Sequence, residues 1–176
     1  MPHEGTPVGR IQALYRYPVK STSGQSLRGA DVTEQGLRND RRWAVYTRDG
    51  GIASGKRTYR FRPVAGLMNW SSTAEDDGGI PVLSSPEGVL YRADDPAASE
   101  ALSAAFGQEL SVRPESTVQH HDESPLHVLT TSSLAALSDL AGAAVDHRRF
   151  RANIILDTGA EPEFLETGWL DAELTL

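Results

Sequence analysis

Apolar and polar residues alternate over short stretches in the first ninety positions, a pattern typical of half-buried β-strands. The runs that fit a strand are Ile11–Val19, Trp43–Thr47, Ile52–Ser54, Val82–Leu83 and Val89–Tyr91. The turn residues Asp49-Gly50 and Pro86-Glu87-Gly88 join the last four into two predicted hairpins. Short strands at this spacing predict a barrel or a sandwich.

The second half of the chain contains two predicted helices. The first has Asp95 as its N-cap and Pro96 at its first position, and it ends before Gly107. The second begins near Thr131 or Ser132 and ends near Gly142. Its 3.6-residue period predicts one apolar face. That face contains Leu134, Leu137 and Leu140.

Two further strands are predicted, a buried one at Ala152–Leu156 and an alternating one at Trp169–Leu176. The fold class is therefore α+β and mainly β. We expect a barrel-like region over residues 1–115 and a second region over residues 116–176, with the boundary inside residues 108–123.

Composition narrows the classes of function. The 176 residues are 39% hydrophobic and 23% charged, as in ordinary globular proteins, and no apolar run approaches the ~20 residues of a membrane span. The N-terminus lacks the pattern of a secretory signal, so we expect a cytoplasmic protein without a membrane partner. The absence of cysteine excludes disulfides and thiolate metal ligands within these residues, and we predict no metal-ligating residue.

Charge is distributed unevenly. Residues 1–70 hold 12 Lys/Arg and 5 Asp/Glu, whereas residues 71–176 hold 5 Lys/Arg and 19 Asp/Glu. Positive charge concentrated in a few segments suits a local anion site, and a solvated basic face is the alternative. The basic stretches lie in strand-like segments without a recognition helix, so nucleic acid is not an expected partner.

The first basic motif is Tyr17-Pro18-Val19-Lys20-Ser21. Pro18 fixes the direction in which the strand leaves its sheet, so Lys20 and Ser21 are expected at a strand end where backbone N–H groups are free. An ammonium, a hydroxyl and open N–H groups suit a phosphate. The alternative is a surface lysine after a turn.

The second motif, Asp40-Arg41-Arg42-Trp43, is predicted to open a strand with Arg41 and Trp43 on one face. An inward-facing guanidinium suits a bidentate phosphate or carboxylate, and the alternative is a pair with an internal Asp or Glu. In the third motif, Phe150-Arg151-Ala152-Asn153, alternation places Arg151 and Asn153 on one face. The Asn amide suits the edge of a heterocycle, or else it holds a loop.

Two other motifs are set aside. Residues 50–57 resemble a P-loop, but Arg57 stands where the magnesium-binding hydroxyl belongs. His120-His121-Asp122-Glu123 resembles a metal cluster, but neighbouring side chains on an extended chain point apart, which favours a solvated loop.

Taken together, these segments resemble the MOSC family, the molybdenum-cofactor sulfurase C-terminal domains, with its associated N-terminal β-barrel domain. The family includes the amidoxime-reducing component and bacterial relatives. The order and spacing of the motifs agree over roughly 160 residues. The matching segments are Tyr17–Ser21, Gly36–Val45, Ser124–Thr130, Phe150–Ile154 and Glu166–Trp169.

The resemblance implies a molybdenum cofactor (Mo-molybdopterin) and reduction of N-hydroxylated or N-oxide compounds. It implies cofactor-binding residues at Lys20, Ser21, Arg41, Ser124, Arg151 and Asn153. Expected partners are the pterin phosphate and an electron-donor protein, or a second chain that completes the barrel. The alternatives are a non-catalytic module that binds a phosphorylated ligand or a partner, and a sulfur-transfer protein. No catalytic residue is predicted, because the family's metal-binding cysteine is missing and the MOSC core is expected to be incomplete at Leu176.

Overall fold

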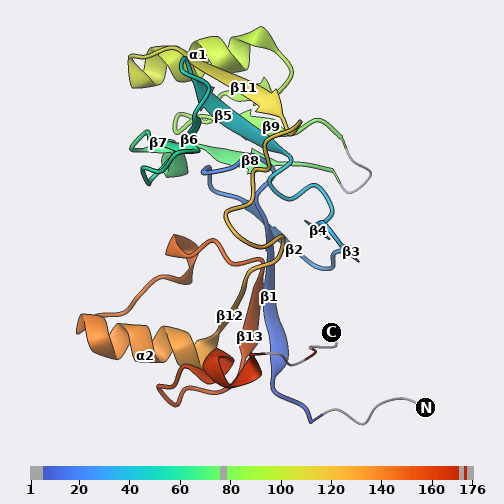
Figure 1. The fold of residues 1–176 in the computed structure, drawn as a ribbon, viewed down its shortest axis with the longest axis vertical. Helices are drawn as coiled ribbons and strands as arrows, with labels where there is room; N and C mark the ends of the chain where they lie inside the picture. Colours follow the sequence, from blue (N-terminus) through green and yellow to red (C-terminus); the bar gives the residue numbers. More distant parts are fainter. Residues whose placement is uncertain (1–5, 76–78, 171–172, 174–176) are drawn as a thin grey trace. The chain divides into compact units, whose positions relative to one another are not determined.

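The computed structural model describes residues 6–75, 79–170 and 173, which divide into two compact units (Figure 1). The first unit combines the start of the chain, up to Leu14, with residues 127–176, and the second contains residues 15–126. The boundary between family domains at residue 115 stays a prediction.

The first unit is built on a sheet in which β13 lies between β12 and β1. β12 runs parallel to β13, and β1 runs antiparallel to it with an irregularity between Ile11 and Ala13. Residues 154–156 are buried, which confirms the predicted buried strand. The elements of this unit are β1 (Arg10–Arg16, of which residues 10–14 belong here), β12 (Val128–Thr130), α2 (Thr131–Ala141), η2 (His147–Arg149), β13 (Ile154–Asp157) and η3 (Leu165–Trp169).

Helix α2 has the predicted ends but a partly different buried face. Thr130 caps its first turn by accepting a hydrogen bond from the Ser133 amide at 3.0 Å, and Gly142 ends it in the left-handed conformation. The buried residues are Ser132, Ser133 and Ala136, whereas Leu140 is 78% exposed. Leu134 and Leu137 are half-buried, so the predicted apolar face is correct in part, and the rest of the buried face packs through hydroxyl hydrogen bonds. Among them is the bond between the Ser132 and Thr158 hydroxyls at 2.9 Å.

The predicted strand at Trp169–Leu176 is not formed where it is described. Trp169 ends the 3-10 helix η3, and Leu170 is in a turn. Residues 171, 172 and 174–176 lie outside the described residues.

The second unit contains several small sheets. β11, β5, β6 and β7 form one mixed sheet, β10, β9 and β8 form an antiparallel sheet, and β3 pairs with β4. Both predicted hairpins, β5–β6 and β9–β10, are confirmed. The elements are β2 (Gln25–Leu27), β3 (Val32–Thr33), β4 (Gly36–Leu37), β5 (Trp43–Thr47), β6 (Ile52–Ser54), β7 (Phe61–Pro63), η1 (Leu67–Asn69), β8 (Ser71–Thr73), β9 (Val82–Ser84), β10 (Leu90–Arg92), α1 (Pro96–Phe106) and β11 (Leu110–Pro114).

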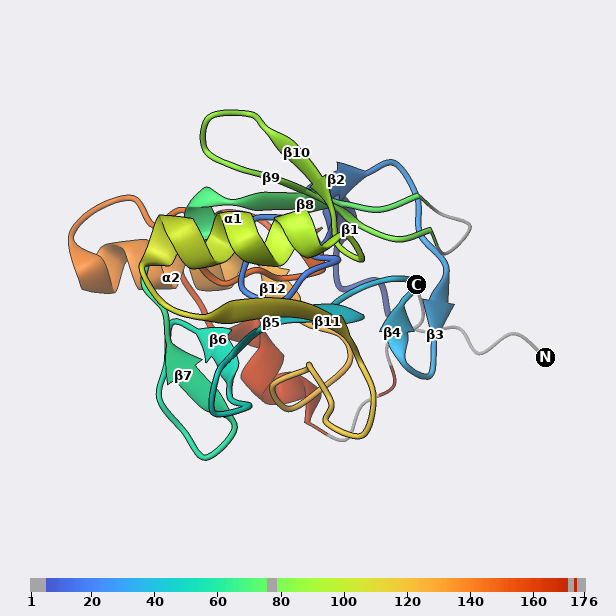
Figure 2. The same ribbon diagram turned by 90° about the horizontal axis from the view of Figure 1, so that it is seen from above.

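The first predicted helix is confirmed as α1. The Asp95 carboxylate accepts from the Ala97 amide at 2.9 Å, and Gly107 ends the helix in the left-handed conformation. Figures 1 and 2 show α1 lying along β11, and the two elements are in contact. Ala98 and Leu102 are the buried residues of this helix.

Strand β5 separates two apolar clusters of the second unit. Val45 points into the main core, which also includes Leu67, Leu83 and Leu102. Because side chains alternate along a strand, Ala44 and Tyr46 face the other way. They form a second cluster with Ile52 and Phe61. The fold is α+β and mainly β, as predicted, and its described strands form open sheets rather than a closed barrel.

Gly36 is required by its surroundings. Its φ is +87°, and an added Cβ would lie 2.1 Å from the carbonyl oxygen of Pro125. We expect Gly36→Ala to lower the free energy of unfolding by about 2 kcal/mol or more, because strain and a backbone clash act together. Gly29 has open space around it. Gly29→Ala is the control and should change stability by less than about 0.5 kcal/mol in urea unfolding. Equal losses would contradict the prediction.

Candidate functional site

Two of the basic motifs lie side by side in the second unit. The Arg41 amide donates to the Tyr17 carbonyl at 2.8 Å, and the Trp43 amide donates to the Pro18 carbonyl at 3.1 Å. The Lys20 amide in turn donates to the Trp43 carbonyl at 2.8 Å. The structure therefore brings together Lys20, Ser21 and Arg41 on two adjoining segments. It also corrects one expectation, since the Lys20 N–H is bonded to the chain rather than free.

Asp40 fixes these two segments to each other. Its carboxylate is fully buried, accepts a hydrogen bond from the Tyr17 amide at 2.7 Å, and pairs with the Arg41 guanidinium. That guanidinium also lies over the Tyr17 ring, 5.0 Å from its centre. Of the two interpretations of Arg41, the pair with an internal carboxylate is present in the structure.

Arg41 is part of a turn, and β5 begins only at Trp43. The prediction that Arg41 opens the strand and shares a face with Trp43 is therefore wrong. The reason is local, because Arg41 has φ +52° and a left-handed residue interrupts the alternation of a strand.

Left-handed backbone occurs at three of the six predicted cofactor-binding residues. Among the described residues, the non-glycine residues with positive φ are Ser21, Asn39, Arg41 and Arg151. Three of these four are predicted to bind the cofactor. This conformation is unfavourable for residues with a Cβ, and it persists where surrounding contacts impose it, which happens often at binding sites.

Lys20 is buried rather than at the surface, with an exposed fraction of 4%. Its ammonium donates to the Asp122 carboxylate at 2.7 Å and lies 4.7 Å from the centre of the Phe61 ring. A buried ammonium is costly unless it is matched by an anion, and here the anion comes from the chain itself. The alternative interpretation of Lys20 as a surface lysine is therefore wrong.

Two more cations surround the same ring. Lys56 Nζ and the Arg60 guanidinium carbon each lie 4.9 Å from the centre of the Phe61 ring. Lys56 also pairs with the second oxygen of Asp122 at 2.9 Å. We call Lys20, Lys56 and Arg60 the cationic cluster. The Asp122 carboxylate contacts two of its three cations, Lys20 and Lys56.

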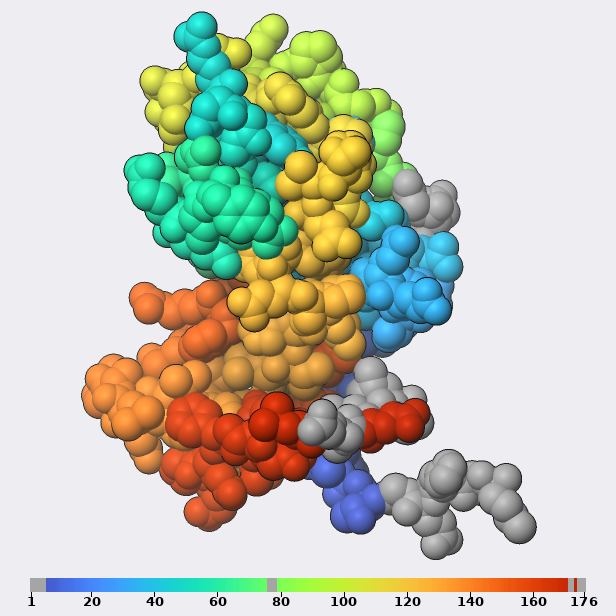
Figure 3. Space-filling model, viewed as in Figure 1, coloured from blue at the N-terminus to red at the C-terminus, as the bar shows by residue number. Residues whose placement is uncertain are grey.

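The guanidinium of Arg60 contacts backbone rather than a carboxylate. It donates to the carbonyl oxygens of Gln119, His121 and Asp122 at 3.2, 3.3 and 2.7 Å. In the space-filling view, the yellow chain around residue 120 lies against the green chain of residues 50–62 (Figure 3). Arg60 thus holds residues 119–122 over the cationic cluster.

His120 anchors this segment and is fully buried. Its Nδ1 donates to the Arg41 carbonyl at 2.9 Å, because a carbonyl can only accept, and its Nε2 therefore accepts from the Tyr46 hydroxyl at 2.9 Å. Burial lowers the pKa of His120 to about 4, so the ring is neutral at pH 7. The prediction of a solvated loop at residues 120–123 is wrong for this residue.

Of the next two residues, His121 is half-buried, whereas the Asp122 side chain is 49% exposed. Both ring nitrogens of His121 are inaccessible and have no hydrogen-bond partner among the described residues, and burial lowers the pKa of this ring. Burial alone would raise the pKa of Asp122. The hydrogen bonds and charges of Lys20 and Lys56 outweigh it and lower that pKa to about 2. Asp122 is therefore ionised at pH 7.

The remaining predicted site residues lie in other contexts. The Ser124 hydroxyl donates to the Leu126 carbonyl at 2.7 Å, within its own turn. Arg151 and Asn153 belong to the first unit, where the buried Asn153 side chain accepts from the His127 amide at 3.1 Å. Asn153 thus fixes the backbone just before β12. Of its two interpretations, the one in which the amide holds a loop is present in the structure. The cofactor roles of all six residues stay predictions.

The motif Glu166–Trp169 has a structural contact of its own. The Glu166 carboxylate accepts from the Thr130 amide at 3.0 Å and from the Ser133 hydroxyl, so it sits at the start of α2. A negative charge near a helix N-terminus is favourable. This accounts for the glutamate at that position.

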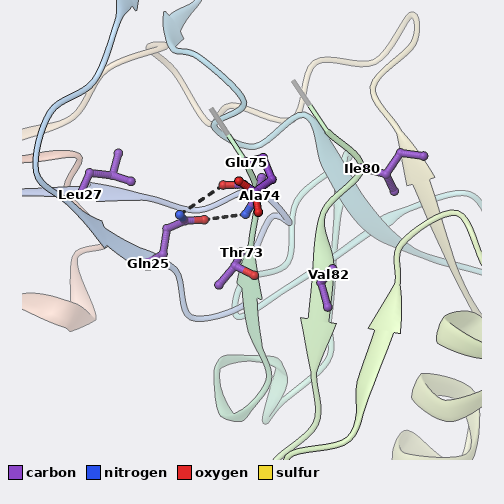
Figure 4. A pocket seen from close by; sticks show the side chains of 7 residues that line it. All are labelled: Gln25, Leu27, Thr73, Ala74, Glu75, Ile80 and Val82. Carbon is purple, nitrogen blue, oxygen red and sulfur yellow. Dashed lines mark hydrogen bonds between the residues drawn. The ribbon is translucent and has the colours of Figure 1, made fainter. Parts of the chain in front are cut away.

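The residues present suit one part of the implied cofactor. Three convergent cations fit a phosphate, whereas the described residues contain no group of three His, Cys, Asp or Glu side chains that could hold a metal. A separate hollow of about 240 Å³ is lined by residues of β2, β8, β9 and their flanks. Figure 4 shows that the side-chain amide of Gln25 in this hollow is already paired with the backbone of Ala74.

Sequence reasoning missed Lys56, Arg60, Phe61 and Asp122. Residues 56–62, Lys-Arg-Thr-Tyr-Arg-Phe-Arg, alternate basic and aromatic side chains, and this pattern could have predicted a cation–aromatic cluster. Nothing local in the sequence identifies Asp122, because its partners lie more than sixty positions earlier.

Comparison with known proteins supports the resemblance over the N-terminal part. Residues 8–84 match the family model of the MOSC N-terminal beta barrel domain. A relative, mitochondrial amidoxime reducing component 2 of Bos taurus, is 36% identical over 74 residues. The match covers 40% of this chain and 20% of the relative, so it spans about a fifth of that protein's length. None of the helices in the described residues has the length and apolar character to cross a membrane.

His120 should make stability depend on pH. The unfolded imidazole gains a proton near its ordinary pKa of 6.5, whereas the folded one stays neutral down to about pH 4. The contribution of His120 to the free energy of unfolding is therefore fully present above pH 6.5. It is lost as the pH falls toward 4, which lowers the free energy of unfolding by about 3 kcal/mol in total. His121 has the same sign, so His120→Gln should flatten this slope without abolishing it. Urea unfolding of both proteins at pH 7 and pH 5 measures the difference, and identical slopes would contradict it.

Proposed function

We propose that the second unit of this chain, whose residues 8–84 match the family model of the MOSC N-terminal beta barrel domain, binds a molybdopterin-type cofactor. The phosphate group of that cofactor binds at the cationic cluster. The observation that carries the proposal is the buried Lys20 ammonium, which contacts the Phe61 ring and pairs with a carboxylate that also pairs with Lys56.

The chemistry of the cluster suits a phosphate better than a single carboxylate. A phosphate carries more negative charge and three acceptor oxygens, so it can accept from several cations at once. Lys20 and Lys56 supply ammonium donors, and the planar guanidinium of Arg60 supplies a fork. Ser21, in its left-handed conformation next to Lys20, adds a hydroxyl.

The reaction is proposed from the family. When bound, the molybdenum cofactor supplies the redox chemistry that reduces N-hydroxylated or N-oxide compounds, and the protein holds and orients it. The matching relative is named for amidoxime reduction. Arg41, Ser124, Arg151 and Asn153 remain proposed contacts of this cofactor, and an electron-donor protein remains a proposed partner.

A second candidate is a non-catalytic module that binds another phosphorylated ligand. The observation that favours it is the absence of cysteine from these 176 residues, which therefore supply no thiolate ligand for the metal. The same absence argues against sulfur transfer, which needs a cysteine persulfide. Both remaining candidates use the cationic cluster, and they differ in whether pterin accompanies the phosphate.

Expression in a host that makes the cofactor tests the proposal. The purified chain should carry pterin, measured by fluorescence after acid oxidation, and Lys20→Gln should reduce it about tenfold because a charge-assisted contact is lost. Arg48→Gln is the matched control, since Arg48 is exposed and its partner, Glu109, lies 3.6 Å away. A Lys20→Gln protein with as much pterin as wild type would contradict the proposal.

The variant must be shown to fold, because it leaves Asp122 without its buried partner. The double variant Lys20→Gln/Asp122→Asn replaces the ion pair with two neutral amides and should unfold at a temperature close to wild type. A wild-type chain without pterin that still binds inorganic phosphate would favour the second candidate.

A further inference from the structure

The carboxylate of Asp122 occupies a distinctive position. One oxygen lies 2.7 Å from Lys20 Nζ and the other 2.9 Å from Lys56 Nζ. Two anionic oxygens between two ammonium groups reproduce the arrangement that two phosphate oxygens would adopt at the same place. Asp122 therefore stands where the ligand of the proposed site would bind.

The segment that carries Asp122 is fixed at one end. The buried His120 ring bonds Tyr46 and the Arg41 carbonyl, and its amide donates to Glu115 at 2.9 Å. Residues 121 and 122 follow this anchor. They are held by the Arg60 guanidinium and by the lysine contacts of Asp122. Because these contacts are electrostatic, an anion that competes for the cations also competes with the segment.

When Asp122 contacts the two lysines, nearby polar groups lack hydrogen-bond partners. The two His121 ring nitrogens and the Arg60 Nε are buried without a hydrogen-bond partner among the described residues. Each such group loses its bonds to water without replacement, and movement of the segment would restore them. The contacts of Asp122 thus hold down a segment that is otherwise poorly satisfied.

We propose that residues 121–122 form an acidic latch, in which Asp122 occupies the phosphate position of the cationic cluster and is displaced when a phosphate binds. The inference rests on the proposed function, because Asp122 is taken to compete with the phosphate for the same cationic cluster. His120 remains in place as the hinge. The exchange replaces one carboxylate by one phosphate, so Lys20 and Lys56 keep an anionic partner in both states.

Removal of the competing charge tests the latch. Inorganic phosphate is titrated by calorimetry at fixed ionic strength into wild type, Asp122→Asn and Glu123→Gln. Asp122→Asn should bind phosphate about tenfold more tightly, because the lysines lose their internal anion. Glu123 is the matched control, since it is exposed and contacts no cation of the described residues. Glu123→Gln should stay within about twofold of wild type.

A second readout follows the segment itself. Hydrogen exchange of amides 121–123 should accelerate when phosphate is added to wild type, and it should be fast in Asp122→Asn without phosphate. Equal gains in both acidic variants, or no gain in Asp122→Asn, would overturn the latch. The proposed function would survive either result if Lys20→Gln still lost phosphate binding. No phosphate binding in any of the proteins, Asp122→Asn included, would overturn both.

Discussion

The second unit depends on the burial of a positive charge. An ammonium withdrawn from water needs a nearby anion, and Lys20 finds it in Asp122, a residue from the far end of the unit. The Lys20–Asp122 ion pair forms next to the Phe61 ring, and Lys56 lies over the same ring. The chain therefore has to bring residues 17–21, 56–61 and 119–122 to one place, and the small sheets between them serve that end.

Strand β5 makes this convergence possible because its two faces pack in different apolar clusters. Val45 belongs to the main core, so one face is committed to packing. Tyr46, on the other face, packs with Ile52 and Phe61 and donates to His120. A short apolar strand thus links the core to the charged cluster, and Trp43 at its start ties in the Tyr17–Ser21 motif.

Local signals in the sequence predicted the elements that local chemistry determines. Asp95, Pro96 and Gly107 specify α1, and Asp49-Gly50 specifies the β5–β6 hairpin, because caps and turns involve neighbouring residues. Periodicity predicted the buried face of α2 only in part, because Ser132 and Ser133 are buried whereas Leu140 is exposed. Alternation failed at Arg41, where a left-handed residue precedes the strand. The contact between Lys20 and Asp122 could not be predicted, since no sequence pattern relates two charges about a hundred positions apart.

The order of the strands has a consequence for synthesis. In the first unit, Arg10 pairs with Asp157, so this pairing cannot form until residue 157 has been made. The second unit is continuous from residue 15 to residue 126, so it can fold while β1 still lacks β13 beside it. During that interval β1 presents unpaired backbone groups, the kind of edge on which other strands can add. This topology therefore requires that the exposed edge of β1 be protected from other strands until β13 has been made.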